Sequence, residues 1–162
     1  MRIIVAAVRE NCPAHLALTM EGVEHEVVMC EGDLGYGEQL ARLWHEGKGF
    51  VLVEHDIVPW PGAMKQIVDC DFQWCSYPYP LNERNGDPLG HLGKALGVMK
   101  FGDRILQRFP DLPDVWAGVP WWNLDGHLEP ELRNRHMVTI HQHMPPVAHV
   151  KIPAVPMPSV KL

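Results

Sequence analysis

Three apolar, β-branched runs separated by two helical patterns constrain the fold of this chain most. The runs are "RIIVAAV" from Arg2, "HEVVMC" from His25 and "FVLVEHDIV" from Phe50. Continuous runs of this kind are typical of strands that are buried on both faces, as in a parallel sheet. Helical patterns at 13–22 and 38–49 lie between them. The order strand, helix, strand, helix, strand predicts an α/β fold with right-handed crossovers.

The rest of the chain predicts further elements of both kinds. They are a helix at 61–70, a strand at 71–79, a polar loop at 80–94, a strand at 95–102, a helix at 103–113 with Asp103 as N-cap, a helix at 119–136 and a strand at 137–144. From Pro145 onward the chain is rich in proline, which favours an extended course. We expect one domain over 1–150 and a proline-rich tail over 151–162 that wraps the domain or a second subunit of a homodimer.

The charge and the start of the chain narrow the function classes. The sequence has 14 Lys and Arg against 20 Asp and Glu, which argues against a broad nucleic-acid-binding face. The apolar run from Ile3 to Val8 is too short for a signal-peptide core or a membrane span, so we expect a cytoplasmic protein. The cysteines lack C-x-x-C and zinc-ribbon spacing, which favours buried free thiols over disulfides or metal ligands. They are Cys12, Cys30, Cys70 and Cys75.

Two carboxylates stand at the end of the third apolar run. In an open α/β sheet, ligands bind beyond the carboxyl ends of the strands. Because strand side chains alternate, Glu54 and Asp56 are expected to share one face, with His55 turned away from it. Together they could approach one divalent cation. The alternative is an acidic strand end that only solvates the sheet.

Histidines gather near the end of the chain. They are His127, His136, His141, His143 and His149. On a strand, His141 and His143 lie on one face, a spacing suited to a metal, and His149 follows from an extended segment. A structural role for each histidine is the alternative.

The segment "WWNLDGHL" places an acid among aromatic side chains. Asp125 lies at or just before the start of a helix, where a carboxylate is favourable for electrostatic reasons alone. Its functional interpretation is a general base, because aromatic walls remove water and raise the pKa of a carboxyl group. Trp121 and Trp122 would then form a platform for a sugar ring, or else belong to the core.

Taken in order, these pieces resemble the GT-A glycosyltransferases, particularly the compact family 2-like members of phage and actinobacterial genomes. The resemblance runs from "RIIVAAV" to "PPVAHV". It implies a three-layer α/β/α sandwich around a mostly parallel sheet. "FVLVEHDIVPWPGAM" looks like the segment whose D-x-D-type acids hold Mn²⁺ or Mg²⁺ against the diphosphate of a nucleotide sugar.

The resemblance also implies roles for single residues. Glu54 and Asp56 stand in the acidic positions, and Asp125 stands where the catalytic base opens a helix, although Asn123-Leu124 replaces the acid that usually precedes it. A late histidine often joins the metal in this family. "VTIHQHMPPVAHV" looks similar, which makes His149 the first choice, with His143 and then His141 behind it.

The remaining assignments concern contacts to the nucleotide, the phosphates and the acceptor. An acid after the second strand often contacts the nucleotide in this family, which nominates Glu31 or Asp33, with plain loop acids as the alternative. Arg84, Lys94 and Lys100 are candidates for phosphate or acceptor contacts, or else surface charges.

We therefore expect a metal-dependent glycosyltransferase that uses a nucleotide-diphosphate sugar. Its acceptor would be a modified DNA base, a glycan, a lipid or a protein, and its location the host cytoplasm if the chain is phage-encoded. One alternative is a zinc-dependent hydrolase whose metal is held by His141, His143, His149 and an acid. Another is a binding protein that keeps the fold without catalysis.

Overall fold

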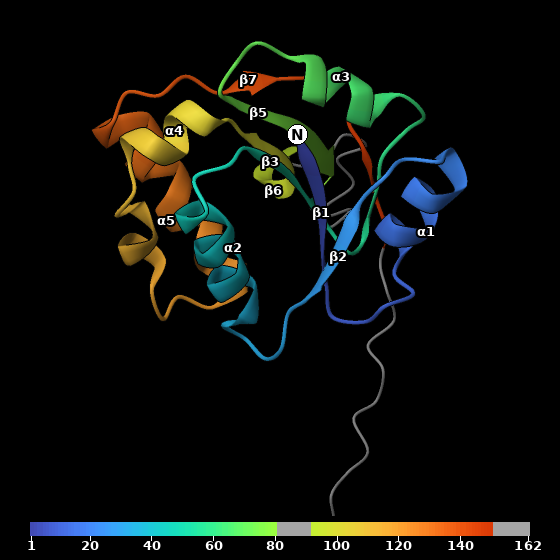
Figure 1. Cartoon of the computed structure of the whole chain (residues 1–162), viewed down its shortest axis with the longest axis horizontal. Coiled ribbons are helices and arrows are strands. Elements are labelled where there is room, and N and C mark those ends of the chain that lie inside the picture. The colour runs from blue at the N-terminus through green and yellow to red at the C-terminus, as the bar shows by residue number, and fades with distance from the viewer. Residues whose placement is uncertain (81–91, 151–162) are drawn as a thin grey trace, which may run out of the picture.

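The structure is a computed structural model that describes residues 1–80 and 92–150 (Figure 1). Its main sheet has six strands in the order β2-β1-β3-β6-β5-β7, and a two-stranded ladder joins β4 to β8. The strands are β1 (Arg2–Ala7), β2 (Glu26–Met29), β3 (Phe50–Glu54), β4 (Ile57–Val58), β5 (Trp74–Pro80), β6 (Leu92–Phe101), β7 (His141–Gln142) and β8 (Ala148–His149).

The sheet is mostly parallel, as the sequence predicts. β1 pairs in parallel with β2 and β3, and β5 pairs in parallel with β7. β6 runs antiparallel to both of its neighbours, β3 and β5, so it alone opposes the direction of the other five strands. The carboxyl ends of β1, β2 and β3 therefore meet at one edge of the sheet.

Helices cover both faces of this sheet. In Figure 1, α1 and α3 lie on one side of the strands, and α2, α4 and α5 lie on the other. The helices are α1 (Pro13–Glu21), α2 (Gly35–His45), α3 (Ala63–Asp69), α4 (Asp103–Arg108) and α5 (Leu124–Pro130). Short 3₁₀ turns (Leu112–Trp116 and Trp121–Asn123) precede α5, and a π-helical turn (Glu131–Arg135) follows it.

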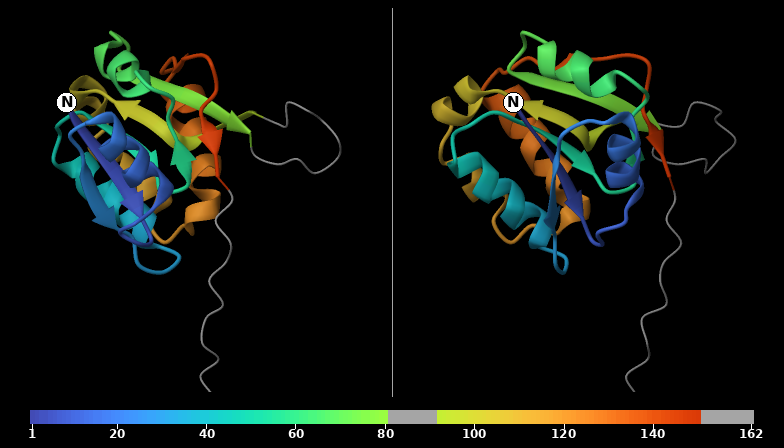
Figure 2. Two further views of the ribbon diagram at one scale, coloured as in Figure 1. Left: turned by 90° about the vertical axis from the view of Figure 1, so that its right-hand side faces the viewer. Right: turned by 45° about the vertical axis from the view of Figure 1, so that its right-hand side comes forward.

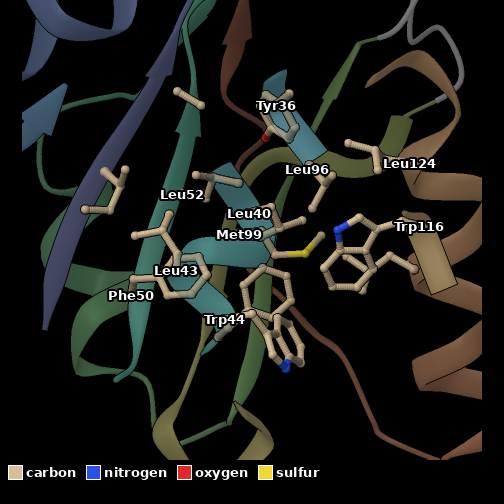
Figure 3. Close-up of a cluster of buried hydrophobic side chains, with 14 of the residues drawn as sticks. Tyr36, Leu40, Leu43, Trp44, Phe50, Leu52, Leu96, Met99, Trp116 and Leu124 are labelled. Carbon is tan, nitrogen blue, oxygen red and sulfur yellow. The ribbon is translucent and has the colours of Figure 1, made fainter. Parts of the chain in front are cut away.

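Two hydrophobic clusters hold these layers together. Alternation along β3 sends Phe50 and Leu52 into the cluster beneath α2 and α5 (Figure 3), while Val51 and Val53 enter the cluster beneath α1 and α3. In the first cluster the Trp116 indole N–H donates to the Gly37 carbonyl, so this large side chain is buried with its polar atom satisfied.

The predicted strand at 50–58 is shorter than expected. β3 ends at Glu54, and residues 55 and 56 form a turn before β4 begins. The carbonyls in this turn leave the sheet ladder, because that of His55 accepts the Ala14 N–H and that of Asp56 accepts the Val150 N–H. The chain can therefore change direction here without losing backbone hydrogen bonds.

Other predicted features also differ from the structure, and the predicted helix at 103–113 ends at Arg108, before a 3₁₀ turn that begins at Leu112. The strand at 137–144 reduces to β7, and the helix at 119–136 is divided into a 3₁₀ turn, α5 and a π-helical turn. Asp103 is not the N-cap of α4, since Gly102 occupies that position. The Asp103 carboxylate instead accepts the Gly49 N–H just before β3.

The segment that contains β7 and β8 returns along the sheet edge beside β5 (Figure 2). Within residues 1–80 and 92–150, no helix has both the length and the apolar character needed to cross a bilayer. The predicted tail at 151–162 and most of the predicted loop at 80–94 lie outside the described residues.

Candidate functional site

A cavity of about 280 Å³ opens at the carboxyl ends of the three parallel strands. This is where ligands bind in open α/β sheets. Its walls come from the ends of β1, β2 and β3, from the start of α2 and from the 3₁₀ turn before α5. The lining residues are Ala6, Val8, Cys30, Gly32, Tyr36, Glu54, His55, Asp56 and Trp121.

Glu54 is the last residue of β3 and lies at the inner side of this cavity. Burial raises its pKa to about 8, and the negative charges of Asp56 and Asp125 add to this effect. The Tyr79 hydroxyl donates a hydrogen bond to the Glu54 carboxylate, which opposes the shift. Acids from two distant parts of the sequence thus act electrostatically on Glu54.

Asp56 forms a pair with His149. The Nε2 atom of His149 lies 3.0 Å from the Oδ2 atom of Asp56. The backbones are held together as well, because Ile57 and His149 are partners in the β4–β8 ladder. The Tyr79 ring packs against the His149 ring, with centroids 5.4 Å apart. This is the carboxylate and histidine combination that the sequence nominates for a metal.

Asp125 lies in the first turn of α5, on the Glu54 side of the sheet. Burial raises its pKa to about 6, and the hydrogen bond from the Leu96 N–H to Oδ1, at 3.2 Å, opposes this shift. Its charge also raises the pKa values of Glu54 and Tyr36, so it belongs electrostatically to the cavity although it does not line it.

The sequence did not predict that Tyr36, Tyr79 and His55 lie at this site. The Tyr36 hydroxyl is buried and has no hydrogen-bond partner among the described residues. His55 lines the cavity with Glu54 and Asp56, so the expectation that it turns away is wrong. Alternation stops where β3 ends at Glu54, and only a prediction of the turn at 55–56 could have shown this.

Of Trp121, Trp122, Glu31 and Asp33, only Trp121 lines the cavity. Both tryptophans are about half exposed, Trp121 at 51% and Trp122 at 53%, and they contact each other edge to face. Glu31 and Asp33 are exposed on either side of Gly32, which does line the cavity. The Asp33 carbonyl accepts the Trp121 N–H at 2.9 Å, which holds this rim together. Arg84 lies outside the described residues.

His143 and His141 lie elsewhere. Both are grouped with Cys70 and Cys75 near β7, whereas His149 lies with Asp56. The structure thus brings His149 to the cavity acids and leaves His143 out. It also separates the three histidines that the hydrolase alternative would need at one metal.

None of the protein-family models matches the sequence, and no curated protein matches it significantly. Solved structures do match. A glycosyltransferase involved in the glycosylation of the major capsid of PBCV-1 aligns with a TM-score of 0.51 and 10% identity, over 91% of this chain and 92% of that one. The chain has a glycosyltransferase-like fold. A197 from STIV aligns with a TM-score of 0.48 and 13% identity, over 67% of this chain and 68% of that one.

The site of this glycosyltransferase-like fold suits a hard divalent cation. Neighbouring ligands of Mg²⁺ at about 2.1 Å in octahedral geometry lie about 3 Å apart. The Asp56 and His149 atoms have this separation, which is also that of the hydrogen bond between them. Burial raises the pKa of Glu54 to about 8, so a bound cation would favour its ionised form, and among the described residues that line the cavity none is Lys or Arg. A cation would offset charge that the described lining leaves uncompensated.

Proposed function

We propose that this chain is a metal-dependent glycosyltransferase of the GT-A type, which moves a sugar from a nucleotide-diphosphate donor to an acceptor hydroxyl. The observation that carries the proposal is the Asp56–His149 pair beside Glu54 and Asp125, at the carboxyl end of β3. The glycosyltransferase-like fold supports it. The three-layer arrangement of that type agrees with hydrophobic clusters on both faces of the sheet.

Asp56 and His149 would hold the cation, Mn²⁺ or Mg²⁺, and the Glu54 carboxylate would balance part of its charge. When bound, the cation neutralises negative charge on the departing nucleoside diphosphate. A protonated Glu54 would leave this position close to neutral in the absence of metal, because its pKa is raised to about 8. The cavity residues are therefore compatible with both the metal-bound and the metal-free protein.

The donor would occupy the cavity. Its volume, about 280 Å³, is close to the lower end of the range for small-molecule sites. Trp121 offers a flat apolar wall at the rim, suited to stacking against a base or a sugar ring. Glu31 and Asp33, on the exposed loop beside it, would accept hydrogen bonds from ribose hydroxyls.

Asp125 would act as the base. With a pKa of about 6 it is ionised at neutral pH yet partly desolvated, the combination that suits proton abstraction. It would take the proton of the acceptor hydroxyl while the acceptor oxygen bonds to the anomeric carbon. The bond from that carbon to the diphosphate oxygen breaks, and the nucleoside diphosphate leaves with the electron pair. Direct displacement of this kind inverts the anomeric centre.

The acceptor classes named from the sequence remain those to test. They are a modified DNA base, a glycan, a lipid and a protein. The net charge of -6 disfavours extended contact with DNA but not the entry of one extruded base.

The decisive experiment is a thermal-shift panel of UDP, GDP, CDP, TDP and ADP, each with and without Mn²⁺. A ligand at a hundredfold excess over its dissociation constant stabilises the folded state by about 2.7 kcal/mol, which raises the melting temperature by several degrees. We expect one nucleotide to do so only with Mn²⁺, and Asp56→Ala to abolish the shift. Asp114→Ala is the control, since Asp114 is exposed and does not line the cavity.

A panel in which no nucleotide shifts the melt in the presence of Mn²⁺ would contradict the proposal. So would a metal-dependent shift of equal size in Asp56→Ala and in the wild type.

A further inference from the structure

A second group of side chains of metal-ligating type lies on the opposite side of β5 from α5, near α3. Cys70, Cys75, His141 and His143 each offer one donor atom, and these four atoms lie within 4.8 Å of one another. The two Sγ atoms are 3.1 Å apart, and Nδ1 of His141 lies 3.2 Å from Sγ of Cys70. Two sulfur and two nitrogen donors thus lie close together.

The fold explains why these residues meet across about 70 residues of sequence. β5 and β7 pair in parallel with Cys75 opposite His141, and the His143 N–H donates to the Ser76 carbonyl. Cys70 is the residue that ends α3, so it approaches the same point from the helix layer. Because alternate strand residues share a face, His141 and His143 both turn toward the cysteines.

The group is partly buried. Cys75 and His143 are buried and Cys70 and His141 are half-buried, while the Phe72 ring stacks on His141 and the Tyr77 ring packs on His143. The Nε2 atom of His143 has no hydrogen-bond partner among the described residues. A buried imidazole nitrogen without a partner is unfavourable, and a metal bond at this atom would remove the deficit.

Two other interpretations explain less. A cluster of hydrogen-bonded thiols and imidazoles leaves this Nε2 atom unsatisfied. A Cys70–Cys75 disulfide would use both sulfurs and leave both histidines without a metal ion to bind. The two thiols are free in the structure. In tetrahedral zinc sites with Zn–S bonds of about 2.3 Å the sulfurs lie about 3.8 Å apart, so zinc requires only a small outward shift.

We propose that Cys70, Cys75, His141 and His143 form a structural zinc site of the Cys₂His₂ type. Thiolate and imidazole donors in this combination select zinc, and four protein ligands leave no open position for a reacting water. The site is distinct from the Asp56–His149 pair and does not rest on the proposed glycosyltransferase function.

Zinc at this site would stabilise the position of β7. β7 is an edge strand of two residues, and the metal would tie it to β5 and to the end of α3. Lys100 holds the same region from the other side, because its buried ammonium group donates to the carbonyls of Val68 and Cys70.

The test begins with the full chain purified without chelators. Elemental analysis should find about one zinc ion per chain, released when a mercurial reagent modifies the thiols. Replacement by Co²⁺ should give the visible bands of a tetrahedral site together with thiolate-to-cobalt charge-transfer absorption. Cys70→Ser and His143→Ala should lose the zinc, and Cys12→Ala and His127→Ala, which lie outside the group, should keep it.

Because the cobalt spectrum is recorded on the wild-type chain, the proposal stays testable even if a variant fails to fold. Wild-type protein without bound zinc that cannot take it up after refolding would overturn the proposal. A Cys70–Cys75 disulfide found by mass spectrometry in protein purified under reducing conditions would do the same, as would a cobalt spectrum without thiolate absorption.

Discussion

The His149 imidazole lies 3.0 Å from the Asp56 carboxylate, although 93 residues separate the two in sequence. The β4–β8 ladder fixes this relationship, because it pairs Ile57 with His149 and Val58 with Ala148. The ladder is short, so the side-chain pair and the backbone pairing depend on each other. A ligand that bridges Asp56 and His149 would therefore stabilise the end of the described chain.

His149→Ala is expected to weaken Mn²⁺-dependent nucleotide binding by about tenfold or more, because one of the two proposed metal ligands is removed. Titration calorimetry with the nucleotide identified in the thermal-shift panel measures the change. His127→Ala is the control, since His127 is exposed on α5. Equal affinity in the two variants would remove His149 from the metal site.

Asp125→Asn is expected to lower the transfer rate by a factor of about 100 to 10,000 while nucleotide affinity is retained, because the base is lost but the donor site is not. In the wild type, kcat/KM should rise with pH through about 6, the pKa of Asp125, since only the ionised form accepts a proton. Rate measurements on both proteins between pH 5 and 8 test this. A wild-type profile that is flat through this range would contradict the assignment.

Glu54→Gln is expected to stabilise the metal-free protein at high pH. Because the folded-state pKa of Glu54, about 8, lies above the unfolded value of about 4.5, its contribution to stability is lost as the pH rises between these values. The amide cannot ionise, so the variant should melt several degrees higher than the wild type at pH 9 and nearly equally at pH 4. Melting curves without metal across this range provide the measurement. A larger gain at pH 4 than at pH 9 would reverse the predicted sign.

Trp121→Ala is expected to weaken nucleotide binding by about tenfold, corresponding to a loss of one stacking contact of about 1–3 kcal/mol. Trp122→Ala is the matched control, because Trp122 is exposed and does not line the cavity. Quenching of intrinsic fluorescence by the nucleotide in each variant compares the two. Equal losses in the two variants would contradict a specific stacking role for Trp121.

Gly97→Ala is expected to disturb the site through a collision between β6 and β5. A Cβ atom at position 97 would collide with the Tyr79 ring, whose hydroxyl hydrogen-bonds Glu54. The collision should cost about 1–3 kcal/mol of stability and reduce the metal-dependent nucleotide shift. In Gly126→Ala the added methyl meets open space on α5, so its stability should stay equal or rise by up to about 1 kcal/mol. Chemical denaturation of both variants checks the difference.

The sequence by itself determined most of the strands and helices and the acids at the end of β3. The apolar runs at Arg2 and Phe50 are rich in β-branched residues, a local pattern that is typical of buried strands. The stripe of Leu124, Leu128 and Leu132 is likewise buried as its spacing predicts. Such periodicity is a property of residues that are close in sequence, so it can be recognised without the tertiary structure.

Only the tertiary structure decided which distant residues meet. His143 and His149 are six residues apart, yet one joins the Cys70–Cys75 group through β7 and the other joins Asp56 through β8. The sequence could not distinguish them, because the choice depends on which strand each segment pairs with and on a turn at 55–56 that ends β3. Long-range pairing is settled by the burial and hydrogen bonding of the whole sheet, which no local pattern records.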